Sequence, residues 1–215
     1  MFDNLDFYVV FDLFLLLLIG MGPKIALVPF LEATQGMEAE TQRKTADTMV
    51  RTAVGTALLL VVLGWFLMRL LHFTPGGANV AGGIVLLLIS LGMLVSPAKK
   101  KDHEKHTGER DPLKMSIYPL AVPYLLNPAG IATLVIVSDD IDSLLFGAIV
   151  IGVVLLVGLI DFAVFRNMDK LSKHLDPSRL VVTEVIFGVL LGSLAVQLMA
   201  DGLAALGIIS GLAGH

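Results

Sequence analysis

The chain has 215 residues, of which 56% are hydrophobic and 16% are charged, with a formal net charge of −4 and a mean hydropathy of +0.85. Soluble domains carry about a quarter charged residues, so this composition excludes an ordinary water-soluble protein and indicates a membrane protein. The negative net charge argues against a nucleic-acid partner. The lack of cysteine in the sequence excludes disulfides, thiol catalysis and cysteine metal sites.

Six apolar stretches have the length of about 20 residues that a helix needs to cross a bilayer. In chain order they cover residues 7–30, 52–71, 79–96, 116–138, 143–165 and 180–206. We therefore predict an all-α membrane protein whose six transmembrane helices lie in the lipid bilayer.

Basic residues are concentrated in three polar connections, at 31–51, 97–115 and 166–179. These connections hold all 15 lysines and arginines of the chain except Lys24 and Arg69. Cytoplasmic loops of membrane proteins carry the positive excess. We therefore expect the three connections in the cytoplasm and both termini on the non-cytoplasmic side.

The basic stretch 97–115 divides the chain into two halves with three predicted helices each. An odd number of helices gives the halves opposite orientations, which is the arrangement of an inverted repeat. Each half opens with a helix interrupted by proline and glycine. We interpret 1–96 as the first repeat, 97–115 as a basic cytoplasmic linker and 116–215 as the second repeat.

The interruptions in the first and fourth helices share one pattern. Gly22-Pro23 and Asn127-Pro128 each combine an N-cap residue with a proline at the first helical position. Each pair is expected to start a half-helix inside the bilayer, and the opposite orientations make the two N-termini face each other near the midplane. Free N–H groups and positive helix-dipole ends make such N-termini anion sites. The alternative is that both breaks only shape packing, because proline and glycine are frequent in membrane helices.

Lys24 places a full positive charge beside the first break. A charge at the bilayer centre costs about 2.5–3.5 kcal/mol on insertion scales, so a partner within the membrane is expected. The candidate partners are Asp161 and Glu184; alternatively, Lys24 reaches the cytoplasmic surface on its long stem and Glu184 is interfacial. The predicted substrate site comprises Gly22, Pro23, Lys24, Asn127, Pro128, Gly130 and Thr133.

The sequence contains no phosphate-binding loop, zinc-protease helix or Gly-x-Ser-x-Gly motif. We therefore expect no enzymatic activity, no cofactor and no metal site. The predicted function is transport of a small polar solute, an amino acid or another carboxylate, by alternating access at a midplane site. The alternative is a non-transporting membrane scaffold whose basic loop contacts a partner or anionic lipid. A coupling ion and a homo-oligomer are both left open.

Three stretches of the sequence resemble the MarC family of bacterial inner-membrane proteins. They are "NVAGGIVLLLISLGMLV" (79–95), "YPLAVPYLLNPAGIATLVIV" (118–137) and "GVLLGSLAVQLMADGL" (188–203). With the first helix included, the resemblance covers nearly the whole chain. It implies six spans, an inner-membrane location and kinship with small-solute exporters and carriers, which include lysine-exporter-like proteins. Some relatives are described as neutral amino acid transporters.

The sequence departs from the family pattern at both breaks. The family's first helix usually carries Asn-Pro-x-Gly-Asn-x-Pro, whereas residues 22–29 read Gly-Pro-Lys-Ile-Ala-Leu-Val-Pro. In the fourth helix the usual Gly-Pro-Gly-Ala is replaced by Asn-Pro-Ala-Gly at 127–130. The resemblance therefore implies the scaffold, while Lys24 favours a more anionic solute or takes the place of a coupling cation.

Overall fold

The computed structural model describes residues 7–95, 111–141, 143–168 and 177–209, and these residues form helices and their connections. The predicted all-helical fold is confirmed for this part of the chain. In chain order the elements are α1 (Phe7–Met21), α2 (Pro23–Ala33), α3 (Ala39–Leu71), α4 (Pro75–Val95), α5 (Pro112–Met115), the interrupted helical segment η2 (Ser116–Leu125), α6 (Pro128–Asp139), α7 (Leu144–Arg166) and α9 (Pro177–Ala205). Most of the predicted linker, residues 97–110, lies outside the described ranges.

Length and composition identify the helical stretches that can cross a membrane. Among the described residues five qualify: Tyr8–Ala33, Ala39–Leu71, Pro75–Gly92, Leu144–Arg166 and Gly188–Ala205. A sixth span results if Pro112–Leu125 and Pro128–Asp139, which are bent by 70° at their junction, are counted as one. The chain is therefore a multi-pass membrane protein with five or six spans.

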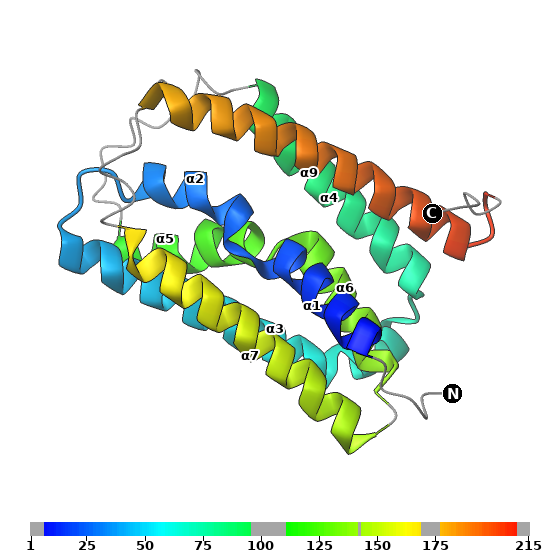
Figure 1. Cartoon of the computed structure of the whole chain (residues 1–215). Helices are drawn as coiled ribbons and strands as arrows, with labels where there is room; N and C mark the ends of the chain where they lie inside the picture. Colours follow the sequence, from blue (N-terminus) through cyan, green and yellow to red (C-terminus); the bar gives the residue numbers. More distant parts are fainter. Residues whose placement is uncertain (1–6, 96–110, 142, 169–176, 210–215) are drawn as a thin grey trace.

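Two pairs of packed helices lie on either side of the broken segments (Figure 1). One pair is α3 with α7, and the other is α4 with α9. The main hydrophobic core joins α1, α2, α3, η2, α6 and α7, and a smaller one joins the α4–α9 pair to α2 and α6. In the second pair a Cβ on Gly83 would lie 2.8 Å from the Ala195 carbonyl oxygen, so the absence of a side chain permits this close packing.

The helical segment η2 differs from the half-helix predicted between residue 116 and the break at Asn127. Its backbone is extended at Tyr118 (φ −136°, ψ 127°) and at Val122 (φ −134°, ψ 123°). Each of these residues precedes a proline, Pro119 or Pro123, and the proline ring disfavours the α conformation for the residue before it. The approach to the second break is therefore irregular, whereas the approach to the first is the regular helix α1.

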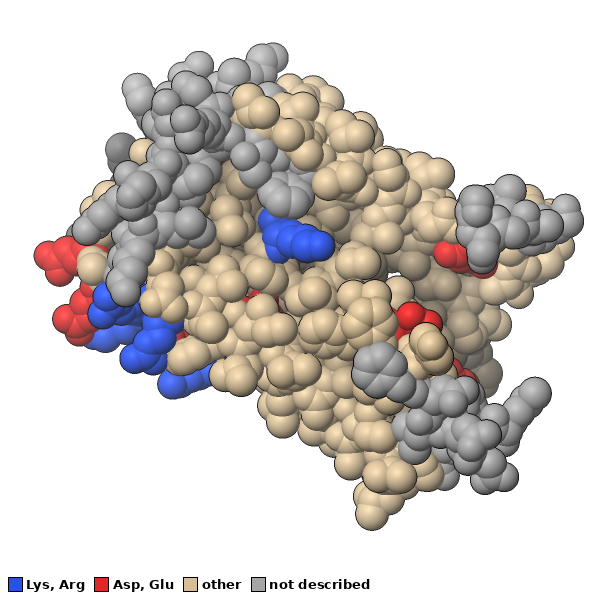
Figure 2. All heavy atoms as spheres, in the orientation of Figure 1, with Lys and Arg blue, Asp and Glu red and all other residues tan. Residues whose placement is uncertain are grey.

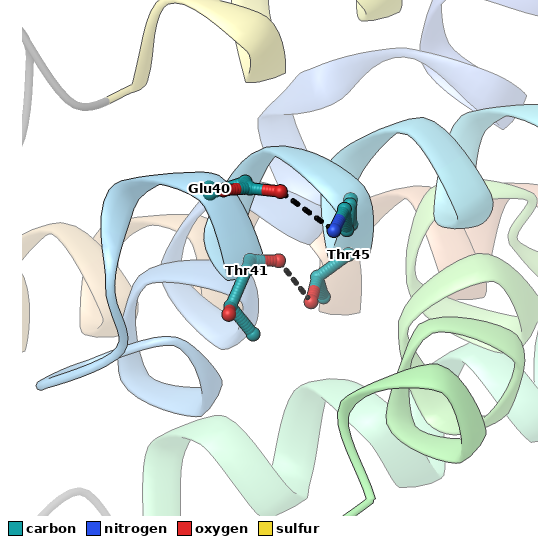
Figure 3. Close-up of polar contacts among 4 residues, drawn as sticks. Glu40, Thr41 and Thr45 are labelled. Atoms are coloured by element: carbon teal, nitrogen blue, oxygen red, sulfur yellow. Dashed lines mark hydrogen bonds and ion pairs between the residues drawn. The ribbon is translucent and has the colours of Figure 1, made fainter.

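Helix α3 begins at Ala39, so part of the polar connection before residue 52 extends this helix. Its first turns carry an ion pair between Lys44 Nζ and Glu40 Oε1 at 2.7 Å, and the Thr45 hydroxyl donates to the Thr41 carbonyl oxygen at 2.9 Å (Figure 3). We call the end of the molecule where α2 is connected to α3 the basic end. Figure 2 shows charged side chains gathered there, next to a broad surface with few charged side chains.

Candidate functional site

The first helix break lies between α1 and α2. Gly22 separates the two helices in an extended conformation (φ −83°, ψ 167°), and Pro23 occupies the first position of α2, as predicted. A Cβ on Gly22 would collide with the Leu18 carbonyl oxygen, so this position requires glycine. Because Gly22 has no side chain, no side chain caps the first turn of α2. The first turn of α2 therefore lacks the side-chain acceptor that an N-cap residue usually provides.

The second break precedes α6 and has almost the same backbone. Asn127 is the N-cap (φ −84°, ψ 167°) and Pro128 the first helical residue, again as predicted. Here the cap has a side chain, and Asn127 Oδ1 accepts a hydrogen bond from the Gly130 N–H at 3.0 Å. The N-terminus of α6 is therefore already capped by its own chain.

The structure brings the two breaks into direct contact. Asn127 Nδ2 donates to the Ile19 carbonyl oxygen at 2.8 Å, and the Asn127 backbone N–H donates to the Gly20 carbonyl oxygen at 2.9 Å. The backbones of Gly20 and Gly130 lie so close that a Cβ on either residue would collide with the other. Asn127 is completely buried at this junction.

The two bonds from Asn127 are explained by the chemistry of the first break. In an uninterrupted helix the Ile19 carbonyl would accept from residue 23 and the Gly20 carbonyl from residue 24. Residue 23 is a proline and has no N–H, and the extended Gly22 turns the next helix away. A buried carbonyl without a donor costs free energy. Asn127 supplies the two missing donors, so the second break satisfies the first.

The remaining predicted site residues lie around this junction in different environments. Lys24 is exposed and Pro23 is half-buried, whereas Pro128 and Gly130 are buried. Thr133 is half-buried one turn into α6, where its hydroxyl donates to the Ala129 carbonyl oxygen at 2.9 Å. Gly22 is buried as well, so Lys24 is the one exposed member of the predicted set.

The structure does not form the predicted ion pair between Lys24 and Asp161. Asp161 lies in α7 and is completely buried, and neither of its carboxylate oxygens has a hydrogen-bond partner. Lys24 is exposed instead, which fits the alternative that its long stem carries the ammonium group away from the interior. The side chain of Glu184 lies outside the described part of the chain. The burial of Asp161 without a partner is therefore not explained by Lys24.

Sequence reasoning missed the part that Ile19 and Gly20 play. Their contribution is made by backbone carbonyls, which no residue type identifies. A usable signal was present nonetheless, because Pro23 leaves the carbonyl four residues earlier without a donor. Gly20 completes the pattern, since only glycine allows the two backbones to approach this closely.

Comparisons with known proteins add independent information. Residues 7–206 match the family model for MarC family integral membrane proteins. UPF0056 membrane protein YvbG of Bacillus subtilis is 25% identical over 191 residues, 86% of this chain and 90% of the relative. UPF0056 membrane protein MJ0972 of Methanocaldococcus jannaschii is 25% identical over 207 residues, 95% of this chain and 90% of the relative. No solved structure matches the chain.

Proposed function

The chain belongs to the MarC family of integral membrane proteins, and on this basis we propose that it transports a small polar solute across the membrane by alternating access. The resemblance seen in the sequence is confirmed by the family match. The observation that carries the proposal is the contact between two helix breaks, made through Asn127. Interrupted helices in corresponding positions of two halves are the best pointer to a transporter's binding site.

The proposal includes an inverted repeat, with α1–α2, α3 and α4 in one half and η2–α6, α7 and α9 in the other. A two-fold axis in the membrane plane would pair corresponding helices. The contacts of α3 with α7 and of α4 with α9 support this arrangement, because each joins corresponding helices of the two halves. The contacts of α1 with α6 and of α2 with η2 also support it, because the axis would interchange them. The near-identical backbone angles at Gly22 and Asn127 support it further.

We place the basic end in the cytoplasm of a bacterial cell and the protein in the inner membrane. The described start of α1 and end of α9 lie at the end opposite the basic end (Figure 1). Because the positive excess marks the cytoplasmic side, both termini then lie on the non-cytoplasmic side. Lys24, just inside α2, lies on the cytoplasmic side of the first break in this orientation.

The proposed solute is an amino acid or another carboxylate, bound first at the N-terminus of α2. The uncapped N–H groups of this turn and the Lys24 ammonium offer an anion both hydrogen bonds and charge. Asn127 and Thr133 supply neutral hydrogen bonds from the α6 side. Because Asn127 Nδ2 is bonded to Ile19 in this structure, it reaches the solute only after the two breaks separate. We interpret the structure as the closed state of the carrier.

Solute counterflow in liposomes tests the proposed function. Purified protein is reconstituted, and exchange of radiolabelled neutral and acidic amino acids is measured for the wild type, Lys24→Ala and the control Lys44→Ala. Lys44 lies at the exposed start of α3, away from both breaks. Saturable exchange that is lost in Lys24→Ala and kept in Lys44→Ala supports the carrier. Exchange that both variants keep at the wild-type rate contradicts the site.

A membrane scaffold is the second candidate, and one observation favours it. Gly20 and Gly130 meet without intervening space, and Asn127 is completely buried, as expected for a junction that only fixes the packing of helices. In a scaffold the junction never opens. Folded wild-type protein that exchanges no amino acid above empty liposomes moves this candidate ahead.

A further inference from the structure

Among the residues whose burial the structure describes, Asp161 is the one completely buried acidic side chain, and the proposed substrate site leaves it unused. It is completely buried in α7, and both of its carboxylate oxygens lack a hydrogen-bond partner. Ionised carboxylates are strongly disfavoured in such a setting unless they are paired. Ionisable residues inside transmembrane segments are rare and commonly belong to ion pathways or proton relays.

The packing of α7 places Asp161 next to the first helix break. The rings of Phe30 in α2 and Phe165 in α7 are in edge-to-face contact with centroids 5.1 Å apart. Both helices run toward the basic end (Figure 1), so Ala26 and Asp161, each four residues earlier, lie one turn back at a common level. Ala26 follows Pro23 by three residues, or about 4.5 Å along the helix axis. Measured along the helix axes, Asp161 therefore lies within about one turn of the start of α2.

Helix α3 packs against α7 one turn before Asp161. Three residues before it, Gly158 packs directly against the Val54 side chain of α3, where a Cβ would have no room. Val50 and Ala57 of α3, one turn on either side of Val54, are buried in the same core as Phe165. Helix α1 also packs against α7, so we expect water to reach the completely buried Asp161 carboxylate only if α7 separates from α1, α2 or α3.

The charged and titratable groups of the helices packed against α7 leave Asp161 without a counter-charge. On α1 (Tyr8, Asp12) and α2 (Lys24, Glu32) these side chains are exposed, and on α3 all are exposed except Asp47. Asp47 is half-buried and its Oδ1 atom has no hydrogen-bond partner, but it is another acid and would repel a charged Asp161. In α7 itself, the Arg166 guanidinium lies over the Phe162 ring, 5.2 Å from its centroid.

We propose that Asp161 is the proton-binding site of the carrier: the carboxylate takes up one proton and is buried as the neutral acid. A proton fits this site because one oxygen atom binds it, whereas hard metal cations take about six oxygen ligands. The described residues contain no group of three or more metal-ligating side chains around Asp161 or elsewhere. This inference rests on the proposed function and names the coupling ion of the same site.

The proposal gives protonation a mechanical consequence. The closed packing of α2, α3 and α7 accommodates a neutral acid but not a lone charge, so loss of the proton favours separation of these helices. Because Asp161 lies at the level of the first turn of α2, this separation also changes the solute site. Proton release and solute release are thereby coupled through one packing change.

Infrared spectroscopy and gradient-driven uptake test the proposal together. The wild type, Asp161→Asn and the control Asp47→Asn are reconstituted in lipid vesicles. We expect the carbonyl stretching band of a buried carboxylic acid at neutral pH in the wild type and in Asp47→Asn, and its loss in Asp161→Asn. Asparagine is a neutral isostere, so this variant should fold and settle in the closed state.

Transport measurements distinguish the coupling of solute to protons from solute transport itself. A pH gradient should drive solute accumulation by the wild type and by Asp47→Asn, and accumulation should be lost in Asp161→Asn. Counterflow, which needs no net proton movement, should be affected less. The absence of the infrared band from the wild type overturns the proposal, as does wild-type accumulation by Asp161→Asn or accumulation driven by sodium alone. A wild type without counterflow contradicts the proposed function instead, and the infrared band still decides whether Asp161 holds a proton.

Discussion

The two helix breaks have the same backbone conformation at the cap residue but form different hydrogen bonds. Gly22 and Asn127 have nearly equal angles, and each is followed by a proline at the first helical position. Asn127 caps its own helix and also bonds the carbonyl of Ile19, while Gly22 caps nothing. The second break therefore closes the junction, whereas the first leaves the N-terminus of α2 without a side-chain cap.

Because of this difference, we expect the two halves of the proposed site to have different roles. The α6 side provides a fixed, completely buried junction, because each amide atom of Asn127 has a partner. The α2 side provides an uncapped turn next to the exposed Lys24. Substitutions on the α6 side should therefore reduce stability, whereas substitutions on the α2 side should reduce solute binding.

Gly130→Ala should have the largest effect on stability. The added Cβ would collide with the Gly20 carbonyl, and a backbone group cannot move aside as a flexible side chain can. We expect a loss of about 3 kcal/mol in the free energy of unfolding, measured in mixed detergent micelles. Gly152→Ala in α7 is the control, since a Cβ there meets nothing within 4 Å and alanine favours the helix. Equal effects of the two changes would contradict the close junction.

Asn127→Ala should have the next largest effect. It removes an N-cap, worth about 1 kcal/mol, and leaves the Ile19 carbonyl without its donor, at a cost of about 1 kcal/mol more. Asn127→Ser is the matched variant, because serine caps a helix well but is too short to reach Ile19. We expect serine to recover about half of the loss in the free energy of unfolding; no recovery would show that capping is irrelevant here.

Pro23→Ala should make the junction less dependent on Asn127. Alanine restores an N–H that can pair with the Ile19 carbonyl if the first break closes. In a double-mutant cycle, Asn127→Ala should cost about 1 kcal/mol less in the Pro23→Ala background than in the wild type. Strictly additive free energies of unfolding would argue against an exchange of donors between residues 23 and 127.

Lys44→Ala should have the smallest effect. Its ion pair with Glu40 is short (Figure 3), but both side chains are largely exposed, at 70% for Lys44 and 78% for Glu40. Exposed pairs of this kind contribute little to stability. We expect no resolvable change in the unfolding transition in detergent, and a marked change would mean that the start of α3 has a role beyond helix extension.

Local sequence rules predicted the breaks but not how they combine. Pro23 and Pro128 fix where α2 and α6 begin, because proline is favoured at the first helical position. The extended backbone angles at Gly22 and Asn127 also follow, because each residue precedes a proline. The bond from Asn127 to Ile19 spans 108 positions in the sequence, and local propensity says nothing about such contacts.

The structure differs from the prediction in two other places. Pro119 and Pro123 were visible in the sequence, yet only the break at Asn127 was predicted, because hydropathy alone defined the stretch before it. The pairing of Lys24 with Asp161 assumed that two opposite charges in one membrane leaflet meet. Packing decides this instead, because α2 and α7 join through Phe30 and Phe165 and leave Lys24 on the outside.

The chain lacks cysteine, so single-cysteine labelling at Lys24→Cys tests most directly whether the open break lines a solute path. The thiol is exposed in intact vesicles to a membrane-impermeant reagent added on one side or the other, with Glu40→Cys at the exposed start of α3 as the control. The account predicts that Lys24→Cys reacts, and that transported solute slows the reaction. A thiol that stays unlabelled from both sides, while Glu40→Cys reacts from one side, would place residue 24 in lipid and contradict the account.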